Sequence, residues 1–116
     1  MRVTLFGATG LLGKALVPQW GKDEVIGLGS SDADIRDAAQ VRAVIERTKP
    51  EWIINAAAYT DVDGCESNQE QAFAVNCQGA VNIAASAKAG GARLISVSTD
   101  YVFDGQNTEP YETTAP

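Results

Sequence analysis

The sequence contains no histidine, and this is the first of several informative absences. Without an imidazole, residues 1–116 lack both the commonest general base and the commonest nitrogen ligand for a metal. Only two cysteines occur, Cys65 and Cys77. They are too few for a disulfide framework, and they lack the clustered partners of a zinc site. We therefore expect two free thiols and no metal centre.

Long apolar runs and an excess of basic residues are missing as well. No stretch approaches the roughly 20 apolar residues that a transmembrane helix requires, and the chain opens on a strand pattern instead of a secretion signal. Nine Lys and Arg stand against fifteen Asp and Glu, which gives a net charge of −6. A nucleic-acid surface depends on clustered Lys and Arg. The sequence predicts a cytoplasmic protein with no membrane and no nucleic-acid partner.

Strand-like and helix-like segments alternate along the chain, with Gly, Pro, Asp and Ser at the joints. Such alternation is typical of parallel strands joined by crossover helices. The pattern predicts an α/β fold, a Rossmann-like doubly wound parallel sheet with the strand order 3-2-1-4. The expected strands are Arg2–Phe6, Glu24–Leu28, Trp52–Asn55 and Arg93–Ser98, and the expected helices are Leu11–Trp20, Ala38–Lys49 and Asn68–Ala89.

Three glycines at three-residue spacing follow the first expected strand, at Gly7, Gly10 and Gly13. Gly7 allows a tight turn, Gly10 leaves no side chain between the backbone and a phosphate, and Gly13 lets the next helix pack close to the sheet. The N-terminus of that helix would face the anion with its N–H groups. The motif favours dinucleotide binding, although close packing alone also explains the three glycines.

Small or polar residues also follow the second strand. The carboxyl ends of parallel strands lie along the same edge of the sheet, so these residues are expected at the edge where the glycine motif lies. Gly29 lies where NAD-binding folds often carry an acidic residue, and Ser30 follows it. A missing carboxylate and an available hydroxyl favour NADP over NAD, while a solvated loop explains the serine as well. Asp34 and Ile35 offer a polar group and an apolar wall for an adenine ring. Alternatively, Ile35 anchors this loop in the core and Asp37 caps the next helix.

The third and fourth strands end in comparable segments. The residues of Asn55–Ala58 are small enough for a ligand to lie against the backbone. Close packing of a helix on this segment would also require small residues. Thr99 and Asp100 follow the last strand, where the nicotinamide end of a dinucleotide is expected. The Thr99 hydroxyl can stabilise a substrate oxyanion, or it closes a turn before Tyr101. Asn76 either bridges backbone groups beneath this site or is an exposed structural residue.

Taken together, these segments resemble the extended short-chain dehydrogenases/reductases, and most closely their dTDP-4-dehydrorhamnose reductase family. That family reduces the 4-keto group of a dTDP-linked 4-keto-6-deoxy sugar with NADPH or NADH. The resemblance covers essentially the whole chain and is carried by Phe6–Gly10, Asp34–Asp37, Asn55–Thr60, Val62, Asp63, Glu66, Val75, Asn76 and Ser98–Gly105.

The resemblance implies a catalytic Thr99, a dTDP-sugar substrate in contact with Thr99 and Asp100, and NADPH or NADH as the cofactor. Together with the residues argued above, it completes a set of predicted cofactor contacts, with no metal among the ligands. That set is Gly7, Thr9, Gly10, Leu11, Leu12, Gly13, Ser30, Asp34, Ile35, Ala57, Ala58, Tyr59, Thr60 and Val97.

One motif of the family is missing from these residues. Family members donate the proton from a Tyr-x-x-x-Lys motif, but Tyr59, Tyr101 and Tyr111 have no lysine four residues on. We therefore expect residues 1–116 to be an incomplete NAD(P)-binding Rossmann domain with little or no turnover by itself. We also expect its fourth strand to be an edge that self-associates. A non-catalytic dinucleotide-binding regulatory subunit and a nucleotide-sugar epimerase or dehydratase stay open as alternatives.

Overall fold

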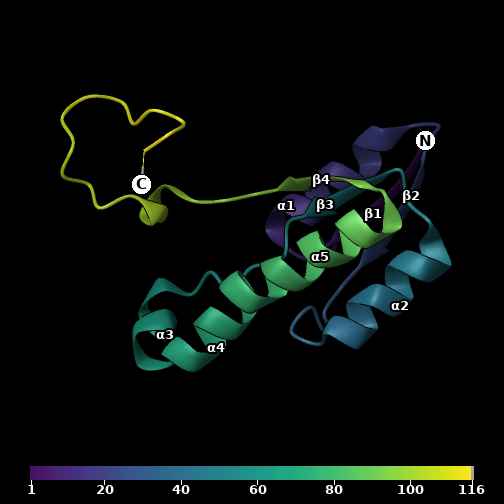
Figure 1. Ribbon diagram of the computed structural model, residues 1–116, viewed down its shortest axis with the longest axis horizontal. Coiled ribbons are helices and arrows are strands. Elements are labelled where there is room, and N and C mark those ends of the chain that lie inside the picture. The colour runs from purple at the N-terminus through teal and green to yellow at the C-terminus, as the bar shows by residue number, and fades with distance from the viewer. Residues whose placement is uncertain (116) are drawn as a thin grey trace.

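The structure is a computed structural model that describes residues 1–115, and it contains a four-stranded parallel sheet between two layers of helices (Figure 1). Each strand coincides with one of the apolar runs expected from the sequence. The strands are β1 (Arg2–Phe6), β2 (Glu24–Leu28), β3 (Trp52–Asn55) and β4 (Arg93–Ser96). The helices are α1 (Leu11–Leu16), α2 (Ala38–Thr48), α3 (Val62–Ser67), α4 (Gln69–Phe73) and α5 (Ala80–Gly90), with the 3-10 helices η1 (Val17–Trp20) and η3 (Asp100–Val102) and the π-helix η2 (Ala74–Gly79).

The strand order is β2-β1-β3-β4, so the predicted order 3-2-1-4 is wrong. β3 pairs in parallel with β1, from Val3 opposite Trp52 to Phe6 opposite Asn55. The physical reason lies in residues 29–37, which form turns joined by irregular segments and so add no strand on the outer side of β2. Helix α2 then carries the chain across β1, and β3 forms on the other side. β2 and β4 are therefore the edges of the sheet.

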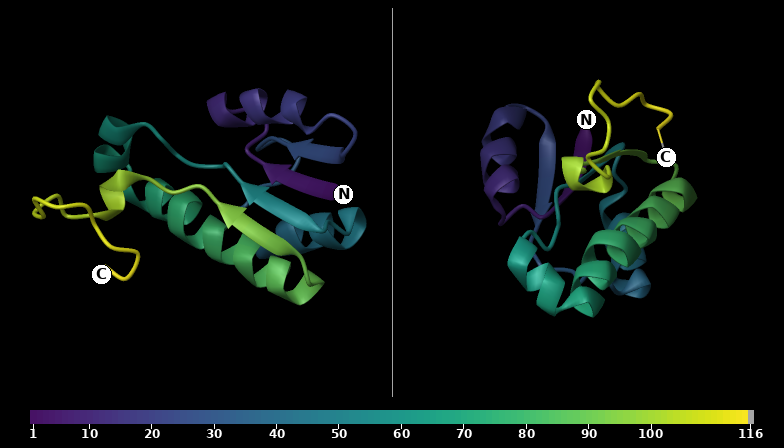
Figure 2. Two further views of the ribbon diagram at one scale, coloured as in Figure 1. Left: turned by 90° about the horizontal axis from the view of Figure 1, so that it is seen from above. Right: turned by 90° about the vertical axis from the view of Figure 1, so that its left-hand side faces the viewer.

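Helices cover both faces of the sheet (Figure 2). On one face, α1 and η1 pack over β1 and β2, around a small core of Val3, Leu5 and Ile54. On the other face, α2 and α5 enclose the larger core, which includes Ile53 and Ile83, both fully buried. Strands covered on both faces read as continuous apolar runs, which explains why they were recognisable in the sequence.

Two of the predicted helices are present close to the expected residues. One of them changes to a 3-10 helix within its span, and the other ends one residue earlier than predicted. The segment Leu11–Trp20 is helical throughout but tightens to a 3-10 helix near Pro18, whose ring nitrogen has no N–H for an α-helical bond. Helix α2 begins after Asp37, which accepts hydrogen bonds from two N–H groups of the first turn. It ends at Thr48, and the C-cap residue Lys49 has a left-handed φ of 43° and precedes Pro50.

The third predicted helix, Asn68–Ala89, is interrupted, and an additional helix precedes it. The π-helix η2 separates α4 from α5, and its wider turn has no signature in hydrophobic spacing. Helix α3 was not predicted, although Asp61 is a recognisable N-cap that accepts a hydrogen bond from the Gly64 N–H at 3.0 Å. Strand β4 ends at Ser96 instead of Ser98.

Cys65 and Cys77 are free thiols, as expected. Across the described residues 1–115, no helix has both the length and the apolar composition needed to cross a membrane.

Candidate functional site

A cleft of about 310 Å³ lies at the carboxyl ends of β1, β2 and β3. Its walls come from the turns that follow these strands and from helix α4. This is the rim at which open parallel sheets bind their ligands. Nine of the predicted cofactor residues line it: Gly7, Thr9, Gly10, Ser30, Asp34, Ile35, Ala57, Ala58 and Tyr59.

The glycine turn after β1 forms the floor of this cleft. Gly7 has φ +83°, and a Cβ there would lie 2.6 Å from the backbone of Ala56 and Ala57. A Cβ on Gly13 would overlap the backbone of Gly7 and Ala8, so α1 packs directly on the turn. The turn and the close helix contact therefore require Gly7 and Gly13 for packing, as predicted.

Gly10 differs from the other two glycines because its open side faces the cleft. A Cβ there would meet only the Gly7 carbonyl oxygen, at 3.3 Å. Gly10 is also the N-cap residue of α1, and among residues 1–115 no side chain accepts a hydrogen bond from this helix end. Its first N–H groups are thus available to an anion. Both features fit the diphosphate of a dinucleotide.

The end of β2 carries a carboxylate that its sequence position did not reveal. The Asp32 Oδ2 accepts a hydrogen bond from the Gly29 N–H at 2.7 Å. The expectation that this strand end lacks a carboxylate is therefore wrong, because the turn folds Asp32 back onto Gly29. Ser30 lines the cleft beside it. The Ser30 hydroxyl group thus lies in the cleft where a ribose is expected, whereas Asp32 is not among the residues that line it.

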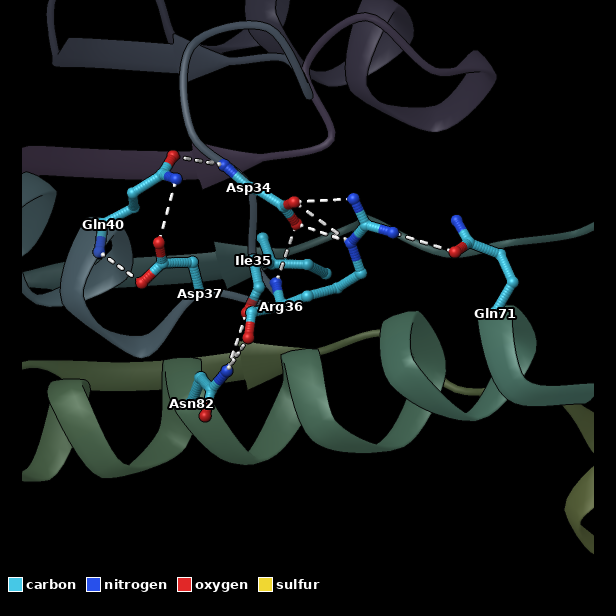
Figure 3. A network of polar contacts seen from close by, with 7 residues as sticks. All are labelled: Asp34, Ile35, Arg36, Asp37, Gln40, Gln71 and Asn82. Carbon is cyan, nitrogen blue, oxygen red and sulfur yellow. Dashed lines mark hydrogen bonds and ion pairs between the residues drawn. The ribbon is translucent and has the colours of Figure 1, made fainter.

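The backbone of the loop Asp34–Asp37 is held by side chains from two helices, α2 and α5 (Figure 3). Gln40 of α2 accepts a hydrogen bond from the Asp34 N–H at 3.0 Å and donates to the Asp37 carboxylate at 3.0 Å. Asn82 of α5 donates to the carbonyl oxygens of Ile35 and Arg36, at 2.9 and 3.0 Å. The backbone of the loop is therefore fixed on both sides.

Both acidic side chains of this loop are held in their charged form. The side-chain hydrogen bonds from Arg36, followed by its backbone N–H, hold the pKa of Asp34 below its ordinary value. The side-chain hydrogen bond from Gln40 has the same effect on the pKa of Asp37. Because both pKa values are lowered in the fold, these interactions stabilise it at neutral pH, and the contribution disappears as the pH falls through the lowered values.

A clamp on the Tyr59 backbone positions the loop after β3. Asn76, within the π-helix η2, accepts a hydrogen bond from the Tyr59 N–H at 2.8 Å and donates to the Tyr59 carbonyl oxygen at 3.0 Å. The prediction that Asn76 bridges backbone groups is confirmed. A π-helical turn at such a position is typical of functional sites.

The structure leaves seven predicted site residues outside the lining of the cleft. Leu11 is 95% exposed at the start of α1, and Val97 is half exposed after β4. The Thr99 hydroxyl accepts a hydrogen bond from the Tyr101 N–H at 3.2 Å and donates to Asp100 at 3.1 Å, so it closes the turn into η3. The seven are Leu11, Leu12, Gly13, Thr60, Val97, Thr99 and Asp100.

Eight further residues line the cleft and were not predicted as contacts. Most of them adjoin predicted ones, but two belong to α4 and η2, which the sequence analysis treated as structural helix. Gln71 and Val75 lie four residues apart and so share one helix face, which is the signal that could have found them. The eight are Phe6, Leu28, Gly29, Ala33, Arg36, Ala56, Gln71 and Val75.

Comparisons with known proteins agree with this arrangement. The family described as RmlD substrate binding domain matches residues 1–116. A dTDP-4-dehydrorhamnose reductase from Mycobacterium tuberculosis is 44% identical over 97% of this chain, and one from Streptomyces griseus is 40% identical over 95% of it. The chain spans 38% and 37% of the lengths of these two relatives.

Solved structures give the same result. A dTDP-4-dehydrorhamnose reductase from Clostridium acetobutylicum superposes on the whole chain with a TM-score of 0.93 and 36% identity, and the chain covers 42% of that structure. One from Bacillus anthracis, in complex with NADP, superposes on 93% of the chain with a TM-score of 0.89 and 37% identity, and 39% of it is covered.

Proposed function

Since the chain belongs to the RmlD substrate-binding domain family, we propose that its cleft binds NADPH or NADH and that residues 1–116 form the cofactor-binding part of a dTDP-4-dehydrorhamnose reductase. The observation that carries the proposal is the single cleft in which the glycine turn and the ends of β2 and β3 meet. We propose NADPH over NADH on this comparison alone: the related enzyme from Bacillus anthracis was solved with NADP, whereas the Asp32 carboxylate removes the support that a missing acid at the end of β2 would have given.

The proposed cofactor runs along the rim of the sheet. Its diphosphate lies on Gly7 and Gly10 and at the start of α1, whose residues Leu11, Leu12 and Gly13 offer backbone N–H groups. The adenine lies against Asp34 and Ile35, with the adjoining ribose near Ser30. The nicotinamide half follows the loop after β3 toward β4. The proposed contacts of this half are Ala57, Ala58, Tyr59, Thr60 and Val97. Thr9, whose side chain lies beside Gly29, is a proposed contact of the adenosine half.

We propose that the reduced group is the 4-keto group of a dTDP-4-keto-6-deoxy sugar, as in the related reductases. When bound, the nicotinamide supplies a hydride. Thr99 and Asp100 contact the sugar, and the Thr99 hydroxyl donates a hydrogen bond to the carbonyl oxygen, where negative charge develops. To do so, it must turn away from Asp100, to which it now donates at 3.1 Å. The proton donor lies outside residues 1–116.

Replacing Gly10 by alanine tests the cofactor proposal. The added methyl meets little of the protein itself, with the Gly7 carbonyl oxygen at 3.3 Å, but it stands where the diphosphate is placed. We expect NADPH to bind the unmodified chain in a calorimetric titration and to bind Gly10→Ala at least about tenfold more weakly. The melting temperature should change little.

Gly90→Ala on α5 is the control, since it adds the same methyl far from the cleft. This methyl meets Ile45 Cγ2 at 3.0 Å, so the melting temperature of the variant is measured beside its NADPH affinity. NADH titrated in parallel measures the preference between the two cofactors. If the unmodified chain bound neither nucleotide, or if Gly10→Ala and Gly90→Ala bound NADPH equally, the placement of the diphosphate would be wrong.

We further propose that the chain self-associates through β4. This strand pairs only with β3 among the described strands, so its outer backbone groups are open to another strand. Ile95 and the nearby Val97 are both 50% exposed. Apolar side chains beside an open edge favour pairing with a second copy of the chain.

Sedimentation at increasing concentration tests this proposal. We expect a mean mass that rises above the 12.2 kDa of the monomer for the unmodified chain. Ile95→Lys should reduce the rise, because it puts a charge beside the edge. Val81→Lys, on an equally exposed residue of α5, should leave it unchanged. A monomer at all concentrations would contradict the proposal.

A further inference from the structure

A second hollow, of about 530 Å³, lies between α2 and α5, apart from the cofactor cleft. Gly79, directly before α5, lies against Ile35, which comes shortly before α2. Gly90, the last residue of α5, lies against Ile45, in the last turn of α2. The two helices therefore run side by side in the same direction (Figure 1). This α2–α5 groove is lined by residues from 42–50 and from 86–90, none of which lines the cleft.

The floor of the α2–α5 groove is apolar. Ile45 is 4% exposed, and Pro50 is buried. Gly90 brings α5 close to α2, since a Cβ there would lie 3.0 Å from Ile45 Cγ2, and Ala89 is the remaining apolar residue of the lining. Small-molecule sites are typically concave and mostly apolar, about 300–1,000 Å³ in volume, with a few polar groups that fix the orientation of the ligand. The groove has the size and the floor of such a site.

Ser86 contributes a polar group to this groove. The residue is 9% exposed, and within residues 1–115 its hydroxyl forms no hydrogen bond. No side-chain nitrogen or oxygen in that part of the chain is both fully enclosed and without a partner, so the hydroxyl opens into the groove that Ser86 lines. Buried polar groups in proteins nearly always have a hydrogen-bond partner. The Ser86 hydroxyl is therefore available to a ligand in the groove.

The charged residues of the groove favour an anion. Arg42 and Lys49 stand against Glu46, so the lining carries one net positive charge in a chain whose net charge is −6. Among the described residues, none of the three forms an ion pair. Because the helices run in the same direction, Arg42 and Ser86 share the end of the groove nearer the cleft. At the other end, the last carbonyl groups of both helices carry partial negative charge and disfavour an anion.

We propose that the α2–α5 groove is a second ligand site, which binds a small organic anion with an apolar body. A carboxylate of the ligand accepts hydrogen bonds from the Arg42 guanidinium and the Ser86 hydroxyl. The apolar body lies along Ile45, Ala89 and Gly90, away from the cleft. The inference goes beyond the proposed function and does not rest on it, because no residue of the groove takes part in the proposed cofactor site.

The test uses 4-phenylbutyrate as the probe and follows the backbone amide signals of the isotopically labelled chain by NMR. We expect saturable shifts at Ile45, Ser86 and Gly90. The dissociation constant should be on the order of 1 mM, as for a ligand with about 12 non-hydrogen atoms. The neutral 4-phenyl-1-butanol has the same apolar body and should bind about threefold more weakly, because it lacks the charge that Arg42 pairs with.

Substitutions separate the two parts of the site. Arg42→Met should weaken 4-phenylbutyrate about threefold and leave the alcohol nearly unchanged, whereas Arg47→Met, on α2 but outside the groove lining, is the matched control. Ser86→Ala should weaken 4-phenylbutyrate about threefold through the lost hydrogen bond. Ala89→Phe fills the apolar end and should abolish the binding of both probes. Ala84→Phe, on an equally exposed class of position in α5 outside the lining, should not.

Three results would overturn the inference. The first is the absence of saturable shifts, or shifts confined to the residues of the cofactor cleft. The second is equal affinity for the carboxylate and the alcohol, or equal effects of Arg42→Met and Arg47→Met. The third is an Ala89→Phe variant that binds 4-phenylbutyrate as the unmodified chain does. A chain that bound 4-phenylbutyrate in the groove but neither NADPH nor NADH would contradict the proposed function alone.

Discussion

Replacing Gly7 by alanine is expected to destabilise the fold by about 3 kcal/mol or more, because two costs combine at this position. The first is conformational, since φ is +83° at Gly7 and an L side chain is strained there. The second is steric, since the new methyl would lie 2.6 Å from the backbone of Ala56 and Ala57. Neither backbone segment can move aside without breaking the β1–β3 pairing. Urea denaturation followed by circular dichroism measures the loss.

Two other glycines separate the two costs. Gly21 has φ +58° and ψ −104° with nothing within 4 Å, so Gly21→Ala carries only the conformational cost, which is above about 1 kcal/mol. At Gly13 the conflict is steric alone, because φ there is negative and the overlap is with the Gly7–Ala8 backbone. If Gly7→Ala were no more destabilising than Gly21→Ala, the close approach of β1 and the loop after β3 would be misplaced.

Asn82→Asp is expected to cost about 3–5 kcal/mol at neutral pH. The side chain is 7% exposed, and its amide donates to two carbonyl oxygens, those of Ile35 and Arg36. A carboxylate there removes both donors and puts a buried charge against two acceptors. Burial favours the protonated form in the fold and raises the pKa of the introduced carboxyl. The loss of stability therefore grows as the pH rises above the unfolded-state pKa and is relieved as the pH falls.

Denaturation at several pH values measures this dependence, and Asn76→Asp is the matched control. Asn76 also donates to a backbone carbonyl oxygen, that of Tyr59, but it is exposed, so water can replace the lost hydrogen bond. We expect this second substitution to cost about 1 kcal/mol. Equal costs for the two, or an Asn82→Asp variant whose stability does not depend on pH, would contradict the burial assigned to Asn82.

The strands and the longer helices were predictable from the sequence, but helix α3, the π-helix η2 and the order of the strands in the sheet were not. Local features mark the elements that were predicted: the apolar run Arg2–Phe6 is a buried strand, and Asp37 begins α2 while Pro50 follows its end. The strand order depends instead on whether residues 29–37 form an additional strand, and turns in that segment decide against it. The family resemblance, which depended on motifs and not on strand order, is confirmed by the match over residues 1–116.

The candidate site was predictable where the backbone approaches the ligand. Gly7 is fixed by a turn geometry that only glycine allows, and Gly10 belongs to the same glycine-rich turn, so both were visible in the sequence. Arg36 and Gln71 were missed because they meet only in the fold, 35 residues apart in sequence. Asp32 was missed for a similar reason, since its carboxylate folds back on Gly29. Side-chain contacts of this kind join residues at irregular sequence separations, so no periodic pattern in the sequence indicates them.

Asn76 and Asn82 stand six residues apart on one continuous helical segment, and each holds a different loop of the cleft. The distance between the Tyr59 loop and the Ile35 loop is therefore set by the rise of that segment and by its π turn. Because the spacing of the two loops is fixed before a ligand binds, binding costs little conformational entropy for ordering these loops. On the proposed placement of the cofactor, a dinucleotide contacts both loops at once, whereas a mononucleotide contacts only one of them.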